Sequence, residues 1–77
     1  MQDRLKTVLE IEMKVVYNPE LDVLRIILSN TQIDERDEEK PGVILDYDKD
    51  GNIVVMEILD ASKRMENPRS MEYAIAS

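Results

Sequence analysis

The fold is decided by one stretch of the chain, VILDYDKDGNIVVMEIL, at residues 43–59. It holds two apolar runs, residues 43–47 and 53–59, joined by a polar link that contains the step Asp50-Gly51. An Asp-Gly step between apolar runs is typical of a β-hairpin, because glycine supplies the positive φ of the turn. The second run is apolar on both faces apart from Glu57, which favours a central strand covered on both sides. This stretch therefore predicts half of an antiparallel sheet.

The preceding part of the chain predicts a second hairpin. Residues 9–17 alternate between apolar and polar side chains, and a period of two indicates a strand with one buried face. Asn18 and Pro19 then favour a turn, and the β-branched run Val23–Leu28 is the strand that should pair back. The residues expected on the buried face of the first strand are Leu9, Ile11, Met13, Val15 and Tyr17.

The C-terminal segment predicts a helix. Asp60 or Ser62 is a suitable cap for a helix that begins near Ala61, and Pro68 should kink or break it. We expect this segment to cover one face of the central strand.

Together these elements predict an α+β fold, with a small four-stranded antiparallel sheet built from two hairpins and a C-terminal helix that is kinked or broken near Pro68. The order of the four strands stays open. We expect one domain over residues 1–77, with an N-terminal extension (1–12), a core (13–64) and a C-terminal helix or tail (65–77).

The composition predicts a thin core. A chain of 77 residues buries only about 60% of the surface that it exposes when unfolded. Three Tyr, no Phe and no Trp reduce the buried area further, since aromatic side chains supply the largest areas. We therefore expect another subunit to cover part of the apolar surface, which makes a homodimer the expected state.

The composition also excludes several classes of function. The chain has neither Cys nor His, which excludes thiol nucleophiles, zinc ribbons and Ser-His-Asp catalysis. A net charge of −7 argues against direct binding to nucleic acid. The longest apolar run has four residues, far short of a membrane span of about 20. We expect a cytoplasmic protein that is not an enzyme, with no cofactor and no membrane contact.

One segment is strongly acidic. Residues 29–40 show no apolar period and contain a run of charged side chains. Such a run is typical of a solvated loop or of a short charged edge strand, and the pattern leaves both open. Its functional interpretation is a contact surface for a small basic protein. The carboxylates of that surface are Asp34, Glu35, Asp37, Glu38 and Glu39.

The hairpin loop also matches the spacing of a calcium-binding loop. Asp46, Asp48 and Asp50 stand at positions one, three and five, Gly51 at six and Glu57 at twelve. An EF-hand needs a helix before this loop, whereas the run before it favours a strand. We therefore favour an acidic hairpin turn, and divalent-metal (calcium) or small-ligand binding stays as the alternative function.

Asp46 and Glu57 are the two carboxylates inside apolar strands. If they were buried and adjacent, they would share a proton or bind a cation, as an acid–base enzyme requires. We expect them instead at opposite strand edges, facing solvent.

Two motifs carry a family resemblance. The first is MKVVYNPE at residues 13–20, followed by VLRI at 23–26. The second is PGVILDYDKDG at residues 41–51, which continues into EILDAS at 57–62. The chain resembles the domain of unknown function 2283 family of small prokaryotic proteins. The resemblance implies a small antiparallel sheet with a helix after the last strand, and no established activity.

The same resemblance implies a binding role. Family members look like the acidic neighbours of small toxins in gene pairs, which implies an antitoxin-like or protein-binding function. Members commonly begin near the position of Met13, so a native start at Met1 or at Met13 stays open.

Overall fold

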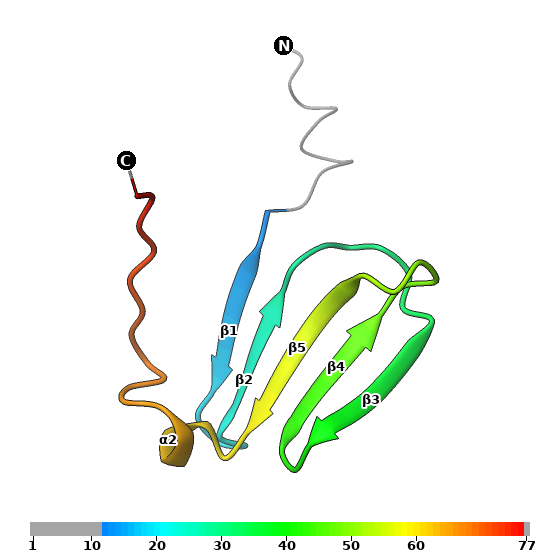
Figure 1. Cartoon of the computed structure of the whole chain (residues 1–77). Helices are drawn as coiled ribbons and strands as arrows, with labels where there is room; N and C mark the ends of the chain where they lie inside the picture. Colours follow the sequence, from blue (N-terminus) through cyan, green and yellow to red (C-terminus); the bar gives the residue numbers. More distant parts are fainter. Residues whose placement is uncertain (1–11, 77) are drawn as a thin grey trace.

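One antiparallel sheet of five strands makes up most of the structure (Figure 1). The structure is a computed structural model that describes residues 12–76. The elements are β1 (Lys14–Asn18), β2 (Val23–Ile27), β3 (Glu35–Lys40), β4 (Val43–Tyr47), β5 (Ile53–Leu59) and the short helix α2 (Ala61–Arg64). The predicted antiparallel sheet and α+β class are confirmed. The predicted count of four strands is wrong, because the acidic run forms β3.

The strands lie in the order β1-β2-β5-β4-β3. The two predicted hairpins, β1 with β2 and β4 with β5, are both present. They join through β2 and β5, where Arg25 lies opposite Glu57. The predicted central position of β5 is confirmed, since Val54 and Val55 are both buried and neighbouring residues of a strand point to opposite faces.

The core is thin, as the composition predicted. Among the described residues, the buried apolar side chains are Leu24, Val54, Val55 and Ala61, and none of the large ones is below 2% exposed. One face of the sheet is a continuous apolar surface that is only half-buried. Its half-buried side chains lie opposite one another across all four apolar strands: Val15, Tyr17, Ile26, Met56, Ile58, Leu45 and Val43.

The alternation predicted for the first strand holds from Lys14 onward. Val15 and Tyr17 are half-buried, whereas Lys14 is exposed. Met13 precedes β1 and is 45% exposed, so its predicted burial is wrong. Leu9, Ile11 and the rest of the proposed extension before Glu12 lie outside the described residues.

The predicted C-terminal helix ends much earlier than expected. The helix α2 has four residues, and within residues 12–76 no helix is long and apolar enough to cross a membrane. The backbone is extended at Met65, and Asn67 then forms a turn around Pro68, in which its side chain and carbonyl accept the amides of Arg69 (3.0 Å) and Ser70 (3.2 Å). Residues 67–76, which we call the C-terminal arm, then run beside β1 (Figure 1). The predicted cover over β5 is therefore wrong.

Asp22 caps α2 from the β1–β2 turn. Its carboxylate accepts the backbone amide (3.0 Å) and hydroxyl (2.8 Å) of Ser62, and its carbonyl accepts the amide of Ala61 (3.0 Å). The Tyr17 hydroxyl donates to the same carboxylate (2.7 Å). Asp60 makes no side-chain cap bond, and the Ser62 hydroxyl donates to Asp22. The helix begins at Ala61 and Asp60 stands at its N-cap position, as predicted, but the capping side chain is that of Asp22, 40 positions before Ser62.

Candidate functional site

The acidic run forms an outer strand of the sheet. Within the described residues the strand β3 pairs with β4 alone, from Glu35 opposite Tyr47 to Lys40 opposite Val43. All six residues of β3 are exposed. Of the two predicted alternatives, the charged edge strand is therefore the one observed. We call the four carboxylates of β3, together with that of Asp34 just before it, the acidic edge: Asp34, Glu35, Asp37, Glu38 and Glu39.

Arg36 turns its charge away from the acidic edge. It lies opposite Asp46 in the β3–β4 register, so the two side chains share a face of the sheet. Its Nη1 contacts Asp46 Oδ1 at 3.0 Å, and its Nη2 contacts Glu57 Oε1 at 2.7 Å. The hydrogen bond with Glu57 raises the pKa of Arg36, and the charge of Asp46 adds to this effect. The guanidinium thus compensates two carboxylates of other strands.

Carboxylates of the acidic edge make hydrogen bonds and no ion pairs within residues 12–76. Glu38 accepts the amide of Gly42 (2.8 Å) and Glu39 accepts the hydroxyl of Tyr47 (2.8 Å). Over residues 12–76, no carboxylate of the acidic edge is in an ion pair. The bond to Glu39 raises the pKa of Tyr47, with smaller contributions from the charges of Glu39 itself, Asp37 and Glu35. The acidic edge therefore gathers five carboxylates whose charge no ion pair compensates in the described part of the chain.

Four charged side chains from four strands form a cluster on the Arg36 face of the sheet. Arg25 Nε contacts Glu57 Oε2 at 3.1 Å, which links β2 to the contacts that Arg36 makes with Asp46 and Glu57. The side chains of Asp46 and Glu57 are only 4% and 17% exposed. The prediction that both face solvent is wrong, because the register places Asp46 opposite Val55, two residues from Glu57 and on the same face of the sheet. The Arg36 guanidinium is the cation between them, and it occupies oxygens that an acid–base pair would need.

The β4–β5 loop is the acidic hairpin turn that its sequence predicted. The Asp48 carboxylate accepts the amides of Asp50 and Asn52, both at 2.9 Å, and Gly51 has a φ of 84°. These bonds, with the Asn52 amide first, lower the pKa of Asp48. Asp48 thus points into its own loop while Asp46 points to Arg36. Within the described part of the chain, no group of three or more Asp, Glu, His or Cys could hold a metal ion. The carboxylates of the calcium alternative do not converge.

A cleft extends the acidic surface beyond β3. It has a volume of about 330 Å³ and lies where the β2–β3 connection meets the β4–β5 loop. Asp34 of the acidic edge lines this cleft together with Asp48 and Asp50. The other lining residues are Thr31, Gln32 and Lys49. The sequence did not indicate this proximity, because it depends on how two loops meet across the sheet.

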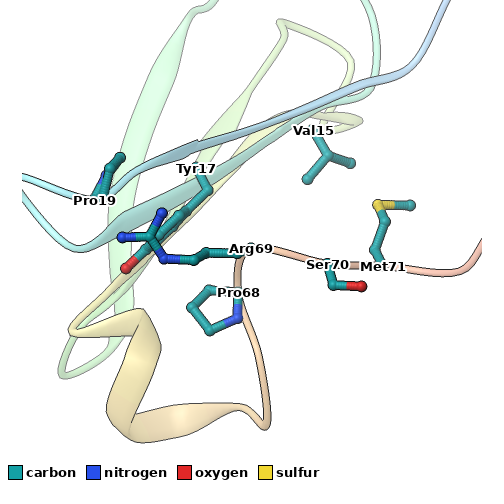
Figure 2. A pocket seen from close by; sticks show the side chains of 7 residues that line it. All are labelled: Val15, Tyr17, Pro19, Pro68, Arg69, Ser70 and Met71. Atoms are coloured by element: carbon teal, nitrogen blue, oxygen red, sulfur yellow. The ribbon is translucent and has the colours of Figure 1, made fainter.

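A second cleft lies between β1 and the C-terminal arm (Figure 2). Its volume is about 320 Å³, and the Arg69 guanidinium lies 5.9 Å from the centre of the Tyr17 ring. Sequence reasoning missed this cleft, because it placed a helix where the arm runs extended. The residues that line it are Val15, Tyr17, Pro19, Pro68, Arg69, Ser70 and Met71.

The fold and the acidic edge place the chain among small α+β proteins built on one antiparallel sheet. The sequence profile of the family described as "Protein of unknown function (DUF2283)" matches residues 14–62, from the start of β1 into α2. The chain belongs to this family, as the two motifs indicated. No curated protein and no solved structure matches the chain. The family match includes the acidic edge and the charged cluster, and it ends before the C-terminal arm.

Proposed function

We propose that this protein is a non-catalytic interaction module of the cytoplasm, and that its acidic edge binds a small basic protein. The observation that carries the proposal is the redirection of Arg36 to Asp46 and Glu57, which leaves the carboxylates of an exposed edge strand without an ion pair among residues 12–76. An antitoxin-like pairing with a small toxin is the form of this function that the family resemblance implies.

Electrostatics supports this choice of partner. Complementary surface charge speeds the encounter of two proteins and fixes their orientation, and its effect falls as salt screens it. The chain has a net charge of −7, and the acidic edge collects five of its 17 acidic side chains on one side of the sheet. A partner with a row of Lys or Arg side chains would therefore be favoured over a neutral one.

The test is a paired charge reversal with a matched control. The double variant Glu35→Lys/Asp37→Lys changes the acidic edge, and Glu20→Lys/Glu72→Lys changes the net charge equally at exposed positions away from β3. Each protein is used to capture partners from a lysate of the source organism at low and then at high salt. We expect the wild type and the control to retain one small basic protein in stoichiometric amount at low salt only, and the acidic-edge variant to lose it. Equal retention by all three proteins, or retention of no basic protein, would contradict the proposal.

A further inference from the structure

The strand β1 forms the other edge of the sheet, and it differs chemically from β3. Within residues 12–76, the backbone of β1 pairs with β2 alone. Its five residues, KVVYN, carry only one charge, that of Lys14, whereas β3 reads ERDEEK. Val16, at the middle of β1, is 41% exposed. An edge strand with one charge and an exposed apolar side chain at its middle is a surface to which another strand can add.

Exposed apolar side chains gather beside this edge. Met13 is 45% exposed, and Met71 and Tyr73 of the C-terminal arm are 58% and 71% exposed. A gap of about 660 Å³, lined by Glu12, Met13, Val15, Met71 and Tyr73, lies between these segments. Val15 and Met71 face one another from β1 and from the arm (Figure 2). The arm therefore presents an apolar side to a space that its own sheet does not fill.

The charge distribution selects a second copy of the chain as the occupant. The acidic edge and β1 lie at opposite ends of the strand order. Two copies that meet at β1 keep their acidic edges at the two far ends of a joint sheet, whereas a contact through β3 would bring like charges together. The net charge of −7 on each copy thus opposes association at β3 far more than at β1.

We infer that two copies of this chain pair edge to edge through β1, antiparallel about a two-fold axis at Val16. Because this axis is perpendicular to the sheet, each face of one copy continues into the same face of the other copy. Of the antiparallel registers that this symmetry allows, the one centred on Val16 pairs all five residues of β1, because Val16 is its middle residue. It places Val16 opposite the partner's Val16, Val15 opposite the partner's Tyr17, and Lys14 opposite the partner's Asn18. No like charges face one another among these five residue pairs.

The same arrangement places the C-terminal arm over the partner. The arm lies on the face of β1 that carries Val15 and Tyr17, since its Arg69 stacks on the Tyr17 ring. Beyond the edge of its own sheet, Met71 and Tyr73 then cover the corresponding face of the added strand. This contact removes exposed apolar surface from water on both copies, which is the main favourable contribution in association.

A single cysteine tests the register. The chain contains no Cys, so Val16→Cys introduces one thiol per copy. Residues opposite one another in an antiparallel pair have Cα atoms about 4.5–5.5 Å apart, within the range of a disulfide. Ile33→Cys, at a position that is 45% exposed near β3, is the matched control. We expect Val16→Cys to form a disulfide-linked dimer under mild oxidation at protein concentrations where Ile33→Cys stays unlinked.

Sedimentation of unlinked proteins supplies the second readout. We expect a dimer for the wild type and for Ile33→Glu, and a dissociation constant raised by about tenfold or more for Val16→Glu, because two carboxylates then face one another. Circular dichroism checks that the variants are folded. A monomeric wild type, a Val16→Cys protein that links no faster than the control, or a Val16→Glu protein that dimerises normally would overturn the inference. Loss of the basic partner would not, since that proposal concerns the opposite edge.

Discussion

Arg36 donates hydrogen bonds to two carboxylates of different strands, Asp46 on β4 and Glu57 on β5. The guanidinium can do this because its donors form a planar fork, and because alternation on β3 points Arg36 to the face that carries both acids. Asp46 is almost fully buried, so it depends on this partner. One side chain therefore stabilises the sheet and leaves the acidic edge uncompensated.

We predict that Arg36→Met destabilises the protein by about 2 kcal/mol, because it leaves the buried Asp46 carboxylate without a charged partner. Urea unfolding measures the change. Arg25→Met is the matched control: among the described residues Arg25 bonds only Glu57, which keeps its contact with Arg36. Its cost should stay within about 0.5 kcal/mol. Equal costs for the two variants would show that the buried position of Asp46 is unimportant.

At the scale of elements, the β3–β4 turn ties three segments together. Gly42 has a φ of 81°, its amide donates to Glu38, and its carbonyl accepts the amide of Leu59 at 2.8 Å. Arg64 of α2 reaches the carbonyl of Pro41 at 2.7 Å, and its guanidinium lies where a β-carbon on Gly42 would stand. Glycine at this position thus serves both the turn and the approach of the helix.

We predict that Gly42→Ala costs about 1 kcal/mol more than Gly51→Ala in urea unfolding. Both glycines have positive φ, so both variants carry the same backbone strain. Only at Gly42 must the new methyl group displace Arg64 from Pro41, whereas Gly51 has open space around it. In an Arg64→Ala background the two costs should become equal. If the cost of Gly42→Ala still exceeded that of Gly51→Ala in this background, the extra cost would arise in the turn and not from Arg64.

The elements also show which parts of the fold can be predicted from sequence patterns alone. The two hairpins follow from apolar runs and turn residues, and both were predicted. The strand β3 carries no such signal, because all six of its side chains face water and no period separates two faces. Its strand conformation comes from backbone pairing with β4 across the turn at Gly42. The arm was misjudged because the pattern allowed a longer helix, whereas the helix ends at Arg64 and the backbone is already extended at Met65.

At the scale of the whole molecule, hydrogen-bonded carboxylates link stability to pH. The hydroxyls of Tyr17 and Ser62 lower the pKa of Asp22 below its ordinary value of 3.8, and the Asn52 amide lowers that of Asp48. A folded pKa below the unfolded one stabilises the folded state above the unfolded pKa, and this stabilisation is lost as pH falls through the folded pKa. The bond to Asp22 also raises the pKa of Tyr17 above 10.0, so its contribution is lost when alkaline pH ionises the hydroxyl.

We predict that the free energy of unfolding falls below about pH 4, where carboxyl groups become protonated. This fall should be smaller in Asp22→Asn and in Asp48→Asn. Tyr17→Phe should reduce the corresponding fall in the free energy of unfolding above pH 10. Urea unfolding between pH 3 and 11 measures the free energy of unfolding over both ranges. Asp50→Asn is the control, because the Asp50 carboxylate accepts no hydrogen bond among the described residues. If Asp50→Asn reduced the fall at low pH as much as Asp48→Asn does, the role of the hydrogen bonds to Asp48 would be contradicted.

The sequence by itself determined the antiparallel sheet, its two hairpins, the central place of β5, the acidic turn at Asp48 and the family. These features depend on neighbours within a few residues of one another, where period, turn chemistry and propensity act directly. Only the tertiary structure decided the fifth strand, the shared guanidinium between Asp46 and Glu57, the cap that Asp22 gives to α2, and the cleft beside β1. The last three join residues that are distant in sequence, and the packing of the chain decides which of them meet; β3 is a local hairpin strand whose exposed side chains show no apolar period.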